Sequence, residues 1–115
     1  MQFGQQQQQP TEISSELRGK IDGIVNKDKV VLFMKGDRQM PQCGFSDTVV
    51  KVLNFYGAEY TTYDILSFPD LRAGMKVYSE WPTFPQLYVN GEFVGGCDII
   101  MEMHQNQEIE AVLKE

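Results

Sequence analysis

The sequence contains little cysteine, which limits the ways in which its fold can be held together. Only two cysteines, Cys43 and Cys97, occur among 115 residues. Two cysteines cannot form the disulfide framework of a small secreted domain, so we expect the fold to depend on its hydrophobic core. Low cysteine usage together with six methionines favours a reducing compartment.

Long hydrophobic runs and an excess of positive charge are also missing. No apolar run approaches the roughly 18 residues of a transmembrane helix, and the first residues lack the hydrophobic region of a signal peptide. The formal net charge is −6 and the sequence pI about 4.7, which argues against a general surface for nucleic acid or anionic membranes. A chain of 115 residues, 42% of them hydrophobic, predicts one globular domain.

Composition divides the chain into a short tail and one domain. Residues 1–10 hold five consecutive glutamines and end in Pro10, and such a segment cannot bury enough apolar surface to order itself. We therefore expect a disordered tail over 1–10 and a folded domain over 11–115. The tail is interpreted as the remnant of a targeting segment, as part of a longer protein, or as residues added in cloning.

Hydrophobic periodicity predicts an α/β fold. Apolar residues at helical spacing from Ile13 predict a first helix of about 14 residues. The unbroken apolar run Val30–Met34 predicts a central strand buried on both faces, and Tyr60–Tyr63 predicts a second strand. Asn90-Gly91 between two apolar-rich runs predicts a hairpin. We therefore expect a four-stranded mixed sheet flanked by helices on both faces, with the first two strands parallel and the last two antiparallel.

Two helix starts are predicted from capping signals. Ser67 and Pro69 indicate the start of the third helix, with Ser67 as the capping residue. Phe68, Leu71, Met75 and Tyr78 are expected to continue that helix on one face. Asp98 is expected to cap the helix that follows it.

Cys43 follows the central strand and precedes the second helix. The first N–H groups of a helix have no partner within it, and together with the helix dipole they favour an anion. For a thiol this anion is the thiolate, so we expect a lowered pKa and a sulfur able to react or to bind metal. A two-cysteine redox motif would have its second cysteine at position 46. Ser46 stands there, and it can donate a hydrogen bond to sulfur but cannot form a disulfide.

Four stretches together carry a resemblance to a known family: Met34–Gly36, Cys43–Ser46, Trp81–Tyr88 and Gly95–Asp98. In this order and at this spacing they resemble the monothiol glutaredoxins, which have the thioredoxin-like fold. The resemblance extends over residues 12–115. It implies glutathione binding, a [2Fe–2S] cluster shared between two protomers, and a role in iron–sulfur cluster delivery and iron homeostasis.

The resemblance also implies a set of site residues, with Cys43 as the catalytic residue and cluster ligand. The implied glutathione-binding residues are Lys35, Cys43, Phe45, Arg72, Lys76, Thr83, Phe84, Pro85, Gly96, Cys97 and Asp98. Lys35 is expected beside the thiol and the glycyl carboxylate. Arg72 and Lys76, four residues apart on one helix face, either complete that end or belong to a solvated surface. Thr83 would offer backbone groups to the tripeptide.

Several residues keep two interpretations. The loop that contains Asp98 opens a helix and suits the γ-glutamyl carboxylate, but Asp98 can equally serve only as a cap. Cys97 belongs to the glutathione loop or pairs with Cys43 in an oxidised form. Trp81 is a structural residue or lies at the edge of the site. His104 is expected on the surface or in packing. The resemblance further implies a cis peptide bond before Pro85.

The two cysteines limit the functions that the chain can perform. A [2Fe–2S] centre needs four ligands, normally thiolates, and only Cys43 lies at the tip of the second helix. Two protomers with two glutathiones would supply four thiolates, which suits a cluster carrier. The alternatives are a glutathione-dependent oxidoreductase that uses Cys43 alone, and a redox-sensing adaptor with a Cys43–Cys97 disulfide.

Partners and location follow from the resemblance alone. It implies a homodimer when the cluster is bound, with BolA-like proteins and iron–sulfur scaffold and acceptor proteins as further partners. We expect no nucleic acid or membrane partner, at most weak oxidoreductase activity, and a mitochondrial location, with cytosol and plastid as alternatives.

Overall fold

The computed structural model describes residues 12–115, so the tail predicted over 1–10 lies outside the described residues. The helices are α1 (Ser15–Lys27), α2 (Gly44–Phe55), α3 (Pro69–Ser79), α4 (Cys97–Gln105) and α5 (Ile109–Lys114). The strands are β1 (Val30–Met34), β2 (Thr61–Asp64), β3 (Gln86–Val89) and β4 (Glu92–Gly95). The predicted element order is confirmed, with β2 beginning one residue later than expected. None of these helices is long and apolar enough to cross a membrane.

The four strands form one mixed sheet in the order β2-β1-β3-β4. Strand β1 is parallel to β2 and antiparallel to β3, and β3 is antiparallel to β4, as predicted. Asn90 and Gly91 connect β3 to β4 with φ angles of +53° and +82°. Two positive φ angles in succession are what a type I′ hairpin turn requires, and the Asn-Gly pair tolerates them.

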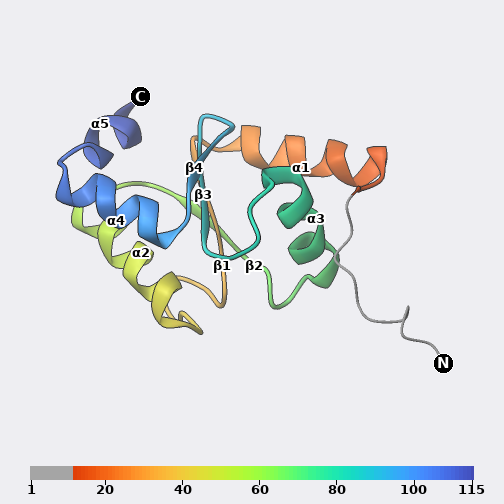
Figure 1. Ribbon diagram of the computed structural model, residues 1–115, viewed down its shortest axis with the longest axis horizontal. Helices are drawn as coiled ribbons and strands as arrows, with labels where there is room; N and C mark the ends of the chain where they lie inside the picture. The colour runs from red at the N-terminus through yellow and green to blue at the C-terminus, as the bar shows by residue number, and fades with distance from the viewer. Residues whose placement is uncertain (1–11) are drawn as a thin grey trace.

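Helices cover both faces of this sheet, giving the thioredoxin-like arrangement. Figure 1 shows α1 and α3 on one face and α2, α4 and α5 on the other. Because successive side chains of a strand point to opposite faces, β1 supplies both cores. Val30, Leu32 and Met34 join the core under α2, α4 and α5, while Val31 and Phe33 join the core under α1 and α3.

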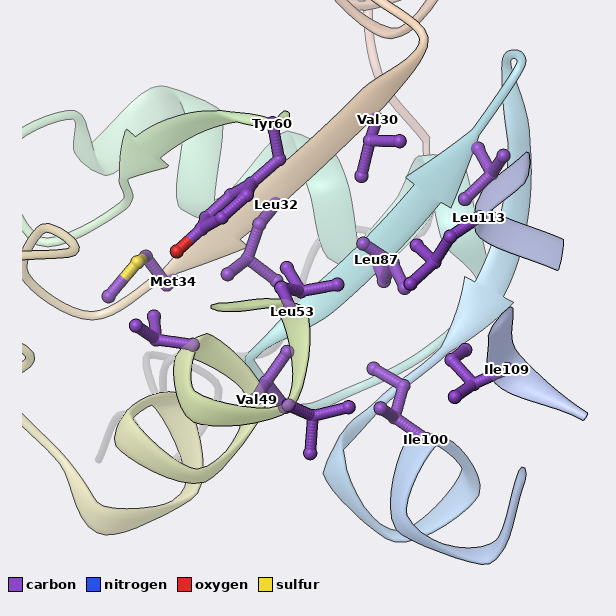
Figure 2. Packing of buried hydrophobic residues seen from close by; sticks show 13 residues of the cluster. Val30, Leu32, Met34, Val49, Leu53, Tyr60, Leu87, Ile100, Ile109 and Leu113 are labelled. Carbon is purple, nitrogen blue, oxygen red and sulfur yellow. The ribbon is translucent and has the colours of Figure 1, made fainter. Parts of the chain in front are cut away.

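The larger core fixes α2 and α4 against the sheet (Figure 2). Leu32 and Leu87 from the sheet meet Leu53 of α2 and Ile100 of α4, and all four are 0% exposed. Full burial of such a side chain contributes about 1.5–3 kcal/mol. The N-terminal ends of α2 and α4, where Cys43 and Cys97 lie, are therefore fixed by apolar packing behind them.

The start of α3 differs from the sequence prediction. Ser67 does not cap the helix, which begins at Pro69 with Phe68 as its N-cap residue and without a side-chain cap. The Ser67 hydroxyl instead donates to Asp64 Oδ2 at 3.0 Å, because that carboxylate lies at the end of β2 and organises the turn. Phe68 precedes the helix as its N-cap residue and is 54% exposed, so the prediction that it continues the apolar face of the helix is wrong.

The start of α4 also differs. The N-cap residue is Gly96, without a side-chain hydrogen bond. Asp98 therefore does not cap the helix but lies in its first turn, where the helix dipole still favours a negative charge.

Asp64 joins the end of β2 to the segment that follows β1. Its Oδ1 accepts from the backbone N–H groups of Gly36 and Leu66, both at 2.9 Å. Burial alone raises the pKa of Asp64, but hydrogen bonds from Gly36, Leu66 and Ser67 outweigh it and hold the pKa below its ordinary value. The ionised carboxylate therefore stabilises the native fold.

Replacement Asp64→Ala should lower the free energy of unfolding by about 1–2 kcal/mol, because the N–H groups of Gly36 and Leu66 lose a charged acceptor. A depressed native pKa stabilises the fold above the unfolded value of about 3.9 and ceases to do so as pH falls through the native value. Wild type should thus lose more stability than the variant between about pH 4 and pH 2, as measured by urea unfolding.

The matched control is Asp47→Ala, which removes an exposed carboxylate that pairs with Lys51 and should cost less than about 1 kcal/mol. Equal losses in the two variants, or identical acid profiles for wild type and Asp64→Ala, would contradict this role.

Candidate functional site

Cys43 is the N-cap residue of α2. Its Sγ accepts a hydrogen bond from Ser46 N at 3.4 Å, which places the sulfur over the unpaired N–H groups of the first turn. The side chain is half-buried, so the sulfur remains accessible from solvent. The sequence prediction that this cysteine lies at a helix tip is confirmed.

Ser46 connects this sulfur to the central strand. Its Oγ lies 3.4 Å from Cys43 Sγ and accepts a hydrogen bond from Lys35 N at 3.1 Å. Ser46 is 0% exposed, so water does not compete for the hydroxyl. Because the Lys35 N–H already donates to this oxygen, the hydroxyl proton is directed to the sulfur once the thiol is ionised.

The two thiols lie in opposite electrostatic surroundings. Partial burial raises the pKa of Cys43, but hydrogen bonds from Ser46 and the Phe45 N–H, with the charge of Lys35, outweigh burial and lower the pKa overall. Burial and the negative charge of Asp98, with a contribution from Cys43, raise the pKa of Cys97. Both cysteines are free. The thiol of Cys43 therefore ionises more readily than that of Cys97.

The segment between β1 and α2 is held in place by local contacts. Gly36 has a φ of +87°, which glycine adopts without strain, and its N–H donates to Asp64. The guanidinium of Arg38 lies 4.0 Å from the ring centroid of Tyr60 and donates to the carbonyl of the same residue. These contacts fix the backbone that follows Lys35, and Met40 in the same segment is 67% exposed.

A groove of about 310 Å³ opens beside this cysteine. It falls at the lower end of the roughly 300–1,000 Å³ typical of small-molecule sites. Its lining residues are Lys35, Phe45, Trp81, Thr83, Phe84, Gly96, Cys97 and Asp98. The structure thus brings together most of the residues that the resemblance implies, and it places Trp81 beside them, in line with the second of its two interpretations.

The other implied residues do not line this groove. Cys43 and Pro85 are chain neighbours of lining residues, but Arg72 and Lys76 lie on α3. Arg72 is exposed and Lys76 half-buried. Larger hollows of about 410 and 380 Å³ lie elsewhere and contain neither cysteine, whereas Cys97 lines the groove and Cys43 lies next to it in the chain, two residues before Phe45.

One wall of the groove is the loop before β3, which includes the cis peptide bond between Phe84 and Pro85 implied by the resemblance. A residue that sequence reasoning missed lies behind it. Gln86 is 0% exposed, and its Nε2 donates to the carbonyls of Trp81 and Thr83. The available signal was a single polar residue at the start of an otherwise apolar strand.

The opposite wall is the N-terminal turn of α4. Gly96 packs against the indole of Trp81, and a Cβ added at this glycine would lie 3.0 Å from Trp81 Nε1. A side chain at position 96 would therefore be in tight contact with the indole, which would have to give way. The first N–H groups of α4, next to Cys97 and Asp98, lie at this wall and favour an anion.

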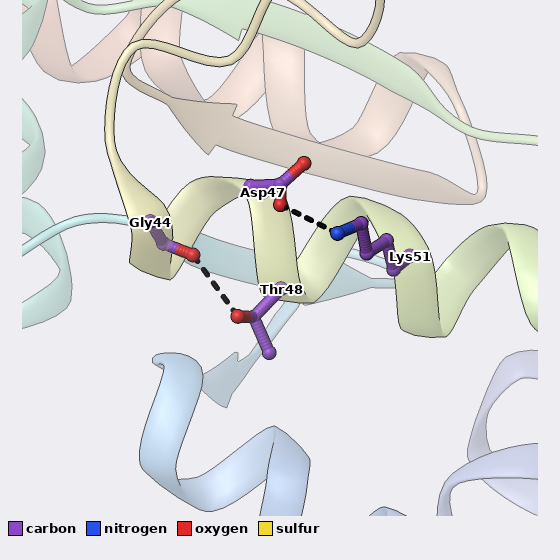
Figure 3. Close-up of polar contacts among 4 residues, drawn as sticks. All are labelled: Gly44, Asp47, Thr48 and Lys51. Carbon is purple, nitrogen blue, oxygen red and sulfur yellow. Dashed lines mark hydrogen bonds and ion pairs between the residues drawn. The ribbon is translucent and has the colours of Figure 1, made fainter.

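The outer face of α2 has no part in the groove. Figure 3 shows Thr48 Oγ1 donating to the carbonyl of Gly44 at 3.0 Å and Lys51 pairing with Asp47 at 2.9 Å. Both contacts are exposed at the surface. They brace the first turns of the helix without touching the sulfur.

His104 is a packing residue, as expected. Its Nδ1 lies 2.6 Å from Tyr56 Oη, at the end of α2 away from Cys43. In the part of the chain that the structure describes, no three His, Cys, Asp or Glu side chains gather closely enough to hold a metal ion.

Replacement Ser46→Ala should raise the pKa of the Cys43 thiol, because the thiolate loses a hydroxyl donor. In a Cys97→Ser background, where Cys43 is the remaining thiol, Ser46→Ala should raise the pH midpoint of alkylation by iodoacetamide. Thr48→Ala, which removes a hydroxyl from the same helix that does not contact sulfur, should keep the wild-type midpoint. An unchanged midpoint in Ser46→Ala would show that the hydroxyl does not stabilise the thiolate.

Comparison with known proteins assigns the chain to a family. Residues 30–94 match the family model described as Glutaredoxin. An uncharacterized monothiol glutaredoxin of Synechocystis is 50% identical over 102 residues, covering 89% of this chain and 95% of the relative. A probable monothiol glutaredoxin 2 of Rickettsia typhi is 55% identical over 95 residues, covering 83% and 86%. Other relatives are described as chloroplastic in rice and mitochondrial in zebrafish.

Solved structures agree with this assignment. Reduced apo GrxS14 from poplar is 49% identical with a TM-score of 0.75, covering 85% of this chain and 90% of that one. A buckwheat glutaredoxin in complex with glutathione is 25% identical with a TM-score of 0.74, covering 89% and 94%. With a serine at position 46 and a single thiol at the helix tip, the chain belongs to the monothiol glutaredoxins.

Proposed function

We propose that this protein binds glutathione in the groove beside Cys43 and carries a [2Fe–2S] cluster between two protomers, as a cluster-transfer protein in iron and redox homeostasis. One observation carries the proposal: an accessible thiol with a lowered pKa adjoins a groove bounded by a lysine and a helix N-terminus. The buckwheat glutaredoxin solved with glutathione supports the same ligand.

The groove offers groups that match the chemistry of glutathione. Lys35 would pair with the glycyl carboxylate, and the backbone of Thr83 would bind the central cysteine residue as an added strand does. The first turn of α4, at Gly96 to Asp98, would receive the γ-glutamyl carboxylate. Phe45 and Phe84 would contribute apolar contact.

Three implied residues have weaker support from their positions. Arg72 and Lys76 lie outside the groove lining, and their long cationic side chains would act on the glycyl end from α3. Pro85 does not line the groove but follows Phe84, and it would contribute to the glutathione site from the loop that presents Thr83.

Cys43 fits a shared cluster. Such a cluster takes four sulfur ligands, and one chain brings only one accessible thiol of lowered pKa to a helix tip. Two copies of Cys43 and two glutathione thiolates would complete the set, and ligands held by a diffusible tripeptide favour release of the cluster to an acceptor. The exposed side chains of Met40 and Phe45, 67% and 63% exposed, would be covered by the second protomer.

A second activity is favoured by the lowered pKa of Cys43. The thiolate would attack the glutathione sulfur of a mixed disulfide, release the other protein as a thiol, and become glutathionylated. A second glutathione thiolate would then attack that bond, regenerate Cys43, and leave as glutathione disulfide. This oxidoreductase route needs one protein cysteine. A Cys43–Cys97 disulfide, BolA-like and scaffold partners, and a mitochondrial location stay predictions from the resemblance.

Anaerobic reconstitution with iron, sulfide and glutathione should give a coloured dimer in wild type and Cys97→Ser but not in Cys43→Ser. The physical reason is that the Cys43 thiol has the lowered pKa, whereas the pKa of Cys97 is raised. The measurement is the visible absorption spectrum together with the mass by size exclusion. A coloured Cys43→Ser protein, or colour without glutathione, would contradict the carrier function. A colourless monomer that removes glutathione from proteins would favour the oxidoreductase.

Replacement Lys35→Ala should weaken glutathione binding about tenfold, because a charge-assisted hydrogen bond of roughly 1.5 kcal/mol is lost. Calorimetry with reduced glutathione measures the affinity. Lys51→Ala changes the net charge equally, but its lysine lies on the outer face of α2 and the variant should bind as wild type does. Equal affinities in both variants would remove Lys35 from the site.

A further inference from the structure

Gln86 is a buried polar residue that the proposed chemistry does not use. It begins β3, where the three residues that follow are apolar and buried, and it is 0% exposed. Its Oε1 has no hydrogen-bond partner in residues 12–115. Burial of an amide costs free energy unless it is hydrogen-bonded. The hydrogen bonds that offset this cost are both made by the Nε2 donor of the side chain.

Both N–H groups of Gln86 hold the loop that forms one wall of the groove. Nε2 donates to the carbonyl oxygen of Trp81 at 3.0 Å and to that of Thr83 at 3.1 Å. The Trp81 N–H donates to Ser79 Oγ at 3.1 Å, so the main chain of Trp81 is held on both sides. With both of its carbonyls bonded to one rigid amide, the loop has a single geometry relative to β3.

The same amide acts on the opposite wall through Trp81. The indole packs on Gly96, where an added Cβ would lie 3.0 Å from Nε1. Trp81 also lies 5.8 Å from Phe93 of β4, measured between ring centroids. A shift of Trp81 would therefore change the contact between the loop and the first turn of α4 as well as the position of the Thr83 backbone.

We propose that Gln86 is a positioning residue that sets the spacing between the two walls of the groove, and thereby the affinity for glutathione, without touching the ligand. Gln86 does not line the groove. Cys43 is held at the tip of α2 by its hydrogen bonds with Ser46. None of these bonds involves the loop of Trp81 and Thr83. The inference rests on the proposed glutathione site.

Two replacements test this role. Gln86→Met keeps the length of the side chain but removes both donors, and its affinity for reduced glutathione should fall about tenfold or more. Gln86→Glu keeps the shape and, when protonated, one donor, so its affinity should lie between those of Met and wild type. Calorimetry gives the affinities, and thermal unfolding shows which variants are folded. If Gln86→Met does not fold, Gln86→Glu decides.

A second readout separates positioning from a general loss of structure. Alkylation of Cys43 by iodoacetamide without glutathione should stay within about twofold of wild type, because the site of modification is independent of the loop. Val89→Ala, on the same strand and 4% exposed, is the stability control, since it should destabilise the fold but keep the glutathione affinity.

The outcomes are distinct. If wild type does not bind glutathione, the proposed function fails before Gln86 is tested. If wild type binds and a folded Gln86 variant binds equally well, the positioning role is wrong. It is also wrong if Val89→Ala loses as much affinity, or if Cys43 alkylation falls together with affinity in the Gln86 variants.

Discussion

The hydroxyl of Ser46 joins the central strand to the reactive end of α2. It accepts from the backbone of Lys35 and lies 3.4 Å from the sulfur of Cys43, so strand, helix and thiol share one polar atom. Since this atom is fully buried, the hydrogen bonds are not exchanged for bonds to water. The position at which other redox proteins have a second thiol thus serves here to direct a proton to the first.

The surroundings of the two cysteines divide their roles. Cys43 has N–H groups, a hydroxyl and a lysine charge that together outweigh its partial burial, whereas Cys97 has burial, Asp98 and the other sulfur against ionisation. Both lie at N-terminal ends of helices, α2 and α4. The helix end alone therefore does not decide which thiol ionises; the neighbouring side chains do.

The groove is formed by segments that are far apart in the sequence and are brought together by the tertiary fold. Its walls come from the end of β1, the loop before β3 and the start of α4, and they meet because the sheet order places β1 beside β3 and β3 beside β4. Apolar packing behind α2 and α4 fixes the two helix tips at this edge. The site is therefore rigid where its donors lie, which lowers the ordering cost of binding.

Local signals in the sequence determined the elements and the reactive residue. Each of these signals acts over a few residues. The apolar run from Val30 predicts a buried strand, Asn90-Gly91 adopts the backbone conformation of a tight turn, and the cysteine before α2 lies beside unpaired N–H groups. Ser67 and Asp98 misled because their hydroxyl and carboxylate looked like caps. The turn after β2 brings Ser67 close to Asp64, so the Ser67 hydroxyl donates to that carboxylate and not to the helix. Helix α4 begins directly after Gly96, so Asp98 lies within its first turn.

What only the tertiary structure decided is the set of contacts between distant segments. Sequence spacing could not show that Gln86 would donate to two loop carbonyls, that Trp81 would pack on Gly96, or that Arg72 and Lys76 would lie outside the groove. These contacts depend on the sheet order and on the angles at which helices pack, and such geometry is fixed by the whole core. The sequence thus determined the thiol and its helix, and the fold determined the walls around it.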